Sequence, residues 1–158
     1  SYSSNVLQMK LDFQDPGKIF ANTKISGIPN VISFSSRNSG GSIIKQLKLY
    51  LSQENFNAVT ALVGMRDSEL MDTFGPQENP YSENEYLELM EFLFEEYESS
   101  NNIRSIIKLS DIIINLDFDG EIVECSGCSG SDSSIEIIIP LLDIVTLEKP
   151  IEVIVEWK

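Results

Sequence analysis

The sequence of 158 residues contains no histidine and only two cysteines. Without histidine, catalytic triads with an imidazole base cannot form, and the commonest metal ligand and near-neutral proton carrier is missing. An enzyme of this composition would have to use carboxylates, lysine or cysteine. So few cysteines argue against a secreted scaffold built on disulfides and favour a reducing, cytoplasmic location, although they still allow one disulfide.

Long apolar runs are also missing. No stretch approaches the roughly 18 consecutive apolar residues of a membrane-spanning helix, and Ser1 to Ser4 lack the basic and then apolar pattern of a signal peptide. The hydrophobic share of 42% and the charged share of 23% are close to those of globular proteins. We therefore expect one folded domain over residues 1–158 that does not bind a membrane.

Positive charge is scarce and unevenly placed. The net charge is −14, of which residues 61–120 carry −11, and the stretch from Asp67 to Glu98 holds eleven acidic residues without a lysine or arginine. Proteins bind phosphate groups through clusters of lysine and arginine, so nucleic acid is not an expected partner. This distribution favours a basic protein as the partner.

The first half of the chain predicts a mixture of strands and one helix. Alternation with a period of two indicates a half-buried strand, and apolar residues spaced three and four apart indicate a helix with one buried face. The predicted elements are a strand over Val6–Phe13, a turn at Asp15–Gly17, a short strand over Lys18–Ala21, an apolar run over Val31–Phe34, a loop over Ser35–Gly41, a helix from Ser42 to Gln53, a buried strand over Ala58–Val63, and a long connection over Gly64–Pro80 with room for a short helix at Ser68–Phe74.

The clearest local signal begins at Ser82. Ser82 and Glu85 have the spacing of a capping box, and Tyr81 and Tyr86 occupy the positions of a hydrophobic staple. These residues predict a helix that starts at Ser82. Its apolar side comprises Tyr86, Met90, Leu93, Phe94 and Tyr97, whereas Glu88, Glu91, Glu95 and Glu98 recur on the opposite side.

Beyond this helix the chain has mainly the pattern of strands. Residues Ile103–Leu109 fit either a short helix or a strand. The predicted elements that follow are a strand over Asp111–Phe118, a two-residue hairpin turn at Asp119–Gly120, a strand over Ile122–Cys125, a loop of small residues over Ser126–Ser134, and strands over Ile135–Ile139 and Ile151–Trp157. This order predicts an α+β fold, a single domain in which two main helices pack on one face of a largely antiparallel sheet.

Three short motifs resemble functional sites, and local structure explains each of them better. Cys125 and Cys128 have the spacing of a redox pair or half a zinc site, but no third cysteine or histidine completes a zinc site. Asn115–Gly120 matches the start of a calcium-binding EF-hand loop, but Ser126 stands where the bidentate glutamate is required. Gly40–Ser42 lies between a predicted strand and helix, where an anion can bind, but it matches no phosphate-binding pattern.

The leading hypothesis is a small acidic binding protein, comparable to the inhibitors and immunity proteins that cover cationic nuclease toxins. The candidate partner-binding residues are Asp67, Glu69, Asp72, Glu88, Glu91, Glu95 and Glu98. Like charges along the helix repel one another, and a basic partner would relieve that repulsion. The competing explanation of the same stripe is a solvated helix face that only aids solubility.

Two other functions compete with this hypothesis. An assembly subunit would pair through the Ile-rich strands at Ile135–Ile139 or Ile151–Trp157, if either lies at a sheet edge. A carboxylate-based enzyme, with or without a divalent metal, would bring three or more acidic side chains into one pocket. The sequence identifies no such set, so we expect no catalytic residue, no metal site and no cofactor. It does not determine the oligomeric state.

Overall fold

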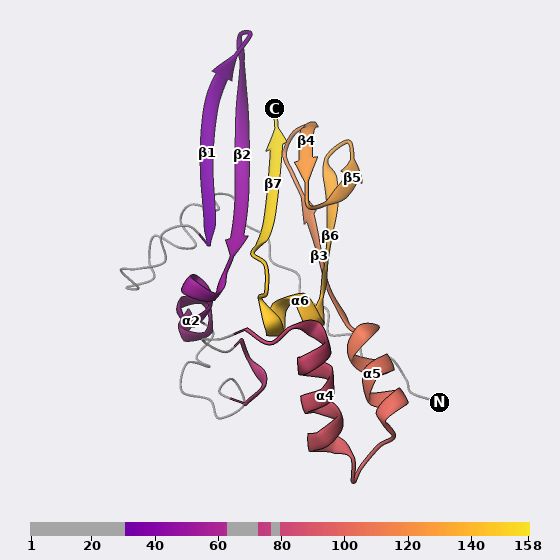
Figure 1. Cartoon of the computed structure of the whole chain (residues 1–158). Coiled ribbons are helices and arrows are strands. Elements are labelled where there is room, and N and C mark those ends of the chain that lie inside the picture. Colours follow the sequence, from indigo (N-terminus) through magenta and orange to yellow (C-terminus); the bar gives the residue numbers. More distant parts are fainter. Residues whose placement is uncertain (1–30, 63–72, 77–79) are drawn as a thin grey trace.

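The computed structural model describes residues 31–62, 73–76 and 80–158 (Figure 1). The strands are β1 (Ile32–Ser39), β2 (Ser42–Leu51), β3 (Asp111–Asp117), β4 (Ile122–Ser126), β5 (Ser129–Ser131), β6 (Ser134–Pro140) and β7 (Ile151–Trp157), and the helices are α2 (Gln53–Leu62), α4 (Glu83–Phe94), α5 (Ser100–Lys108) and α6 (Leu141–Thr146). The elements predicted over Val6–Phe13, Asp15–Gly17 and Lys18–Ala21 lie outside the described residues, as does most of the connection over Gly64–Pro80.

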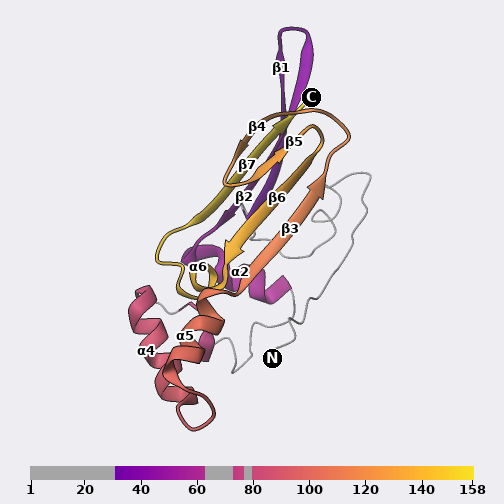
Figure 2. The same cartoon turned by 90° about the vertical axis from the view of Figure 1, so that its right-hand side faces the viewer.

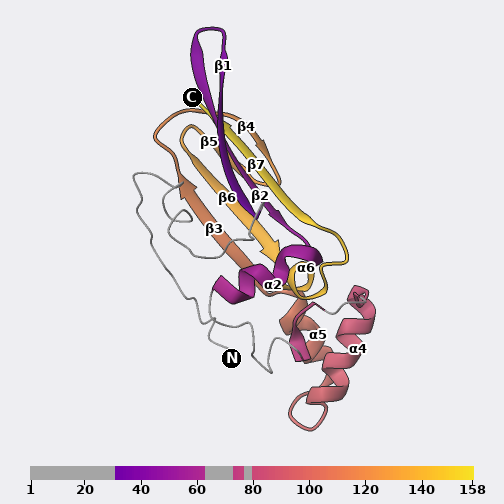
Figure 3. The ribbon, with the colours of Figure 1, turned by 90° about the vertical axis from the view of Figure 1, so that its left-hand side faces the viewer.

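The strands form two antiparallel sheets that face each other. One sheet has the order β1-β2-β7-β4 and the other the order β3-β6-β5. The second sheet lies in front in Figure 2, and the β1–β2 hairpin lies in front in Figure 3. In all these views the helices gather at one end of the sheets, and the hairpin extends past the other end. The predicted α+β class with antiparallel strands is confirmed.

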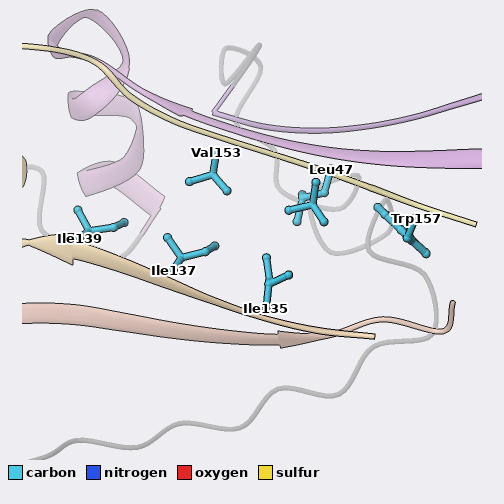
Figure 4. Close-up of a cluster of buried hydrophobic side chains, with 7 residues drawn as sticks. Leu47, Ile135, Ile137, Ile139, Val153 and Trp157 are labelled. Carbon is cyan, nitrogen blue, oxygen red and sulfur yellow. The ribbon is translucent and has the colours of Figure 1, made fainter. Parts of the chain in front are cut away.

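A layer of apolar side chains between the two sheets forms the larger core. Alternate residues of a strand point to the same face, so β6 and β7 each direct three side chains into this layer. They are Ile135, Ile137 and Ile139 from β6 and Val153, Val155 and Trp157 from β7, joined by Leu47 from β2. Figure 4 shows the isoleucines pointing toward Val153, Leu47 and Trp157. Burying one such side chain contributes about 1.5–3 kcal/mol, so this layer is what holds the sheets together.

The predicted strands at Ile135–Ile139 and Ile151–Trp157 are confirmed as β6 and β7, but both are interior strands. β6 lies between β3 and β5, and β7 lies between β2 and β4. In the described part of the chain, the sheet edges are instead β1, β4, β3 and β5. The edge pairing expected of an assembly subunit therefore has no basis in the two strands for which it was proposed.

The loop predicted over Ser35–Gly41 and the helix predicted from Ser42 to Gln53 are wrong, because β1 and β2 form a hairpin here. Gly40 and Gly41 make its turn with φ of 59° and 88°, the positive values that such a two-residue turn requires. Leucine alternates with other residues over Leu47–Leu51, which fits a strand as well as the apolar spacing fits a helix. Pairing with β7 decides between the two.

A buried carboxylate ties this hairpin to the centre of its sheet. Glu156 on β7 is 6% exposed and accepts hydrogen bonds from Arg37 Nη2 at 2.6 Å and Gln46 Nε2 at 3.0 Å. The hydrogen bond from Arg37 lowers the pKa of Glu156, and Gln46 adds to the effect. Glu156 alternates with Val155 and Trp157, so these contacts join β1, β2 and β7 on the face away from the larger core.

The strand predicted over Ala58–Val63 is also wrong, because Gln53–Leu62 forms α2. The Ser52 amide donates to Asn55 Oδ1 at 2.8 Å, and the Ser52 carbonyl accepts from the Phe56 amide at 3.0 Å. A side chain that returns to the backbone at the first turn satisfies an amide left unpaired by the helix. This contact stabilises the start of the helix, whereas the β-branched residues that follow favour a strand.

The predicted start of the acidic helix is confirmed, because Ser82 caps α4. Ser82 Oγ accepts from the Glu85 amide at 3.4 Å, and Glu85 Oε2 accepts from the Ser82 amide at 2.8 Å. The hydrogen bond from the Ser82 amide is the main cause that lowers the pKa of Glu85. A cap of this kind contributes about 1 kcal/mol.

A second, smaller core lies among the helices at the end of the sheets. Its buried residues are Tyr86, Leu87 and Met90 from α4, Ile103 from α5 and Leu142 from α6. The ambiguous segment Ile103–Leu109 thus belongs mainly to a helix. Since α6 directly joins β6 to β7, this core is attached to the two central strands. None of the described helices is long and apolar enough to cross a membrane.

The hairpin turn predicted at Asp119–Gly120 is wrong, because β3 and β4 belong to different sheets. The connection crosses between the sheets and closes the end of the larger core. Phe118 packs on Trp157 with ring centroids 4.6 Å apart. Asp119 accepts hydrogen bonds from Lys45 Nζ at 2.7 Å and Trp157 Nε1 at 2.9 Å, and these two donors lower its pKa.

Gly120 passes close to the end of β7. Glu121 and Lys158 exchange backbone hydrogen bonds of 3.1 and 3.0 Å. A Cβ atom on Gly120 would overlap the carbonyl oxygen of Lys158. Glycine is required at this position because the two backbones approach so closely.

Gly120→Ala is expected to lower the free energy of unfolding by about 1–3 kcal/mol, because the added methyl group forces the connection away from Lys158. Urea unfolding, followed by the fluorescence of the single tryptophan, Trp157, measures this change. An unfolding midpoint equal to that of the wild type would show that the connection can move without loss of stability.

Asp119→Asn tests whether the ionised carboxylate of Asp119 stabilises the fold. The folded-state pKa of Asp119 is lowered, so ionised Asp119 stabilises the fold above the unfolded-state pKa, and this contribution is lost as the pH falls through the folded-state pKa. We expect the variant to be less stable than the wild type at about pH 7, with a difference that shrinks below about pH 4. Urea midpoints over this range provide the measurement, and a constant difference would contradict the assignment.

Candidate functional site

Four of the seven acidic residues predicted to bind a partner lie among the described residues. They are Glu88, Glu91, Glu95 and Glu98, on α4 and in the turn that follows it, whereas Asp67, Glu69 and Asp72 lie outside the described residues. The four described residues divide into two pairs with different surroundings. One pair makes contacts within the protein and the other pair faces solvent.

Glu91 and Glu98 make structural contacts. Glu91 Oε1 accepts a hydrogen bond from Arg104 Nε on α5, and both side chains are partly buried. Glu98 Oε1 accepts from the Ser99 amide at 2.8 Å and from Asn102 Nδ2 at 2.9 Å, at the start of α5. These two carboxylates therefore help to join α4 to α5.

Glu88 and Glu95 are exposed, and two further exposed residues close to them in the chain were omitted from the sequence prediction. Phe92 is 69% exposed, and Glu96 is exposed next to Glu95. Phe92 follows Glu88 by four positions on α4, so these two side chains are neighbours on the helix, and Glu95 and Glu96 begin the turn that directly follows it. We call Glu88, Phe92, Glu95 and Glu96 the α4 acidic surface.

The charge of the α4 acidic surface is uncompensated. No lysine or arginine in the described part of the chain pairs with Glu88, Glu95 or Glu96, and the last turn of α4 contains no basic residue. The C-terminal end of a helix carries partial negative charge, which disfavours nearby carboxylates. Glu95 and Glu96, which follow the last turn of α4, thus lie in an unfavourable electrostatic position in the free protein.

The predicted apolar side of α4 is buried only in its first half. Tyr86 and Met90 are buried, but Leu93, Phe94 and Tyr97 are 39%, 38% and 81% exposed. The helix ends at Phe94, and the following turn carries Tyr97 away from the helical core. An apolar side chain that is exposed in this way can contact another molecule.

Phe94 and Tyr97, but not Leu93, line an open groove of about 570 Å³, which we call the apolar groove. Its walls come from α2, the segment at residues 74–76, α4 with its following turn, α5 and α6. They include Phe56, Phe74, Phe94, Tyr97, Ile106 and Ile144. Of the described residues that line it, Glu98 alone is charged. Ligand sites of this size and apolar character are typical of small molecules and of peptide segments.

The wall of the groove is held in place by two contacts across it. The Tyr86 hydroxyl donates a hydrogen bond to the Phe74 carbonyl at 3.1 Å, and burial raises the pKa of that hydroxyl. The rings of Phe74 and Phe94 stack with centroids 6.1 Å apart. The groove is therefore largely formed before any ligand binds.

A second cavity, of about 400 Å³, lies beside the start of α4, α6 and the segment leading into β7. Glu83, Asp143, Glu148, Lys149 and Glu152 are among its lining residues. Burial, reinforced by Glu83, raises the pKa of Asp143, and Lys149 opposes the effect. No three acidic or cysteine side chains in the described ranges lie close enough to hold a metal ion.

The two cysteines form a disulfide between Cys125 and Cys128. Cys125 lies in β4 and Cys128 directly precedes β5, so the bridge closes the loop where the chain passes from one sheet to the other. Both side chains pack against the larger core. Disulfides are typical of oxidising compartments, so this bridge does not support the expected cytoplasmic location.

The remaining two motifs also have structural explanations. Gly40–Ser42 lies at the turn between two strands, so the helix N-terminus that would bind an anion is not formed there. In the segment that resembles a calcium loop, both carboxylate oxygens of Asp119 accept protein hydrogen bonds, and Asp117 Oδ1 accepts from Ser134 Oγ at 2.7 Å.

No protein-family model, no curated protein and no solved structure matches this chain. The function must therefore be argued from the surface itself. The two surface features that bear on function are the α4 acidic surface and the apolar groove.

Replacing Glu95 and Glu96 by lysine is expected to raise the free energy of unfolding by about 0.3–1 kcal/mol per charge, since cations favour the C-terminal end of a helix. The matched control is Glu85→Lys at the other end of α4, which removes the capping partner of Ser82 and should lower stability. Urea unfolding at low salt measures both. A destabilised double variant would show that Glu95 or Glu96 already makes favourable contacts.

Proposed function

We propose that this protein binds a basic protein partner through the α4 acidic surface. The observation that carries the proposal is the combination of three glutamates with no ion-pair partner among the described residues and an exposed phenylalanine between them. Charge alone would suit a solvated helix face. Phe92, which is 69% exposed, adds an apolar contact to those charges.

The two components suit different parts of a binding reaction. A net charge of −14 attracts a basic partner over several ångströms and can raise association rates by tenfold to a thousandfold, roughly, at low salt. Aromatic side chains are enriched among the residues that dominate interface energies once water is excluded. Glu88, Glu95 and Glu96 would guide the partner, and Phe92 would anchor it.

The class of protein that best fits this proposal is an inhibitor or an immunity protein. Such proteins cover a cationic surface on another protein, for which neither catalytic residues nor a cofactor is needed. We expect the protein to act in the cytoplasm, although disulfides such as Cys125–Cys128 are more typical of oxidising compartments. It does not include nucleic acid as a partner, because phosphate binding requires clusters of basic residues.

Self-association through a sheet is the second candidate, supported by one observation. Ile113 and Ile138 are neighbours in the β3–β6 register, and they are 55% and 52% exposed on the outer face of that sheet. Interaction patches typically cover roughly a few hundred square ångströms, and two side chains form a much smaller patch. The helical end exposes more apolar side chains than this sheet face does. It also carries the glutamates that have no ion-pair partner among the described residues.

Glu88→Lys with Glu95→Lys is expected to slow association with the basic partner by about tenfold at low salt and to weaken the salt dependence of the rate. The partner is first isolated by affinity capture from cells that make this protein, and stopped-flow mixing at several salt concentrations then measures the association rate. Glu91 is left unchanged because it pairs with Arg104.

The matched control is Glu124→Lys with Glu136→Lys on β4 and β6, which makes the same change in net charge at residues that form no ion pair in the described part of the chain. We expect this control to alter the rate by less than about threefold, since steering depends on charges near the docking face. Equal effects of the two double variants would show that only net charge matters. Unchanged rates in the α4 variant would show that the α4 acidic surface is only a solvated face and does not bind the partner.

A further inference from the structure

The apolar groove and the α4 acidic surface meet at the C-terminal end of α4. Tyr97 lines the groove and directly follows Glu96 in the chain. Leu93, in the last turn of α4, is also exposed. A molecule that fills the groove from this end would therefore lie against the glutamates as well.

We propose that the apolar groove receives an amphipathic segment of the basic partner, with apolar side chains in the groove and lysine or arginine beside the glutamates. The inference rests on the proposed function, because charge complementarity identifies the occupant. The groove needs apolar side chains, since its described lining contains one charged residue. The adjoining surface needs cations, since its carboxylates have no ion-pair partner in the described chain.

The shape of the groove favours a segment of chain over a small molecule. Tyr97 and Ile106 line its walls and are 81% and 47% exposed, so the groove opens broadly to solvent between them. A small apolar ligand is usually enclosed over most of its surface, whereas a helix or strand lies in an open groove and leaves its polar side in water. Occupancy of this groove would cover the exposed ring of Tyr97 in the turn after α4.

The test uses the full chain and a synthetic amphipathic peptide of about 14 residues, made of leucine and lysine with the leucines spaced three and four apart. A peptide of the same composition in scrambled order retains the charge without the apolar face. Surface plasmon resonance gives the association rate, the dissociation rate and the affinity. The groove variants are Tyr97→Ala and Ile106→Asn, both at exposed positions where the fold should tolerate a change. Leu109→Ala is the control, because Leu109 is 81% exposed and does not line the groove.

We expect each groove variant to weaken binding of the amphipathic peptide at least about tenfold, mainly through a faster dissociation rate. Leu109→Ala should change the affinity by less than about twofold, and the scrambled peptide should bind at least about tenfold more weakly than the ordered one. Equal affinities of the two peptides, or groove variants that bind like the wild type, would overturn the inference. So would displacement experiments in which the neutral dye Nile red occupies the groove and the peptide does not compete with it.

The same assay separates this inference from the proposed function. Glu88→Lys with Glu95→Lys should slow association of the peptide and reduce its salt dependence while leaving the dissociation rate nearly unchanged. If only the groove variants have an effect, the groove binds apolar segments and the proposed electrostatic function fails. If only the charge variant has an effect, the electrostatic function stands and the groove inference fails.

Discussion

The apolar contact between β6 and β7 is the interaction on which the rest of the molecule depends. Ile137 and Val155 are almost completely buried where the two sheets meet, and removing one such side chain typically costs about 2–5 kcal/mol. β7 also supplies the hydrogen-bonding edges for β2 and β4, so the hairpin and the crossover both attach to it. Through α6, which joins β6 to β7, the same contact fixes the position of the helical end.

The residues that stabilise the fold and the residues proposed to bind a partner therefore lie in different parts of the molecule. The sandwich end contains the larger core, the Glu156 pairing and the closure by Asp119, all of which favour folding. At the helical end, Glu95 and Glu96 follow the last turn of α4 with no ion-pair partner among residues 31–62, 73–76 and 80–158, and Phe92 and Tyr97 are exposed. Features that lower stability in the free protein persist where they contribute to binding. The rigid sheets can support such a surface because its residues take no part in the larger core.

The sequence predicted the parts of the fold that depend on short-range chemistry. The capping box at Ser82 and the alternation in β6 and β7 determine their elements almost without help from distant residues. The prediction from sequence failed where contact with a distant segment determines the secondary structure. The pattern of β2 fits either a strand or a helix, and pairing with β7 makes it a strand. Asp119–Gly120 is equally suited to a hairpin and to a crossover, and the contacts to Lys45 and Trp157 choose the crossover. The spacing of the glutamates pointed to Glu88 and Glu95 but missed Phe92 and Glu96, and it did not separate them from Glu91 and Glu98, which make contacts within the protein. The groove required the packing of several helices and could not be predicted.

Amide hydrogen exchange of the free protein and of its complex with the captured partner tests the central claim most directly. Exchange reports which backbone segments become protected when a partner binds. The account predicts increased protection over α4, the following turn and α5, with unchanged exchange in β2, β6 and β7. Protection confined to the strands or to the β1–β2 hairpin, with α4 and α5 unaffected, would contradict it.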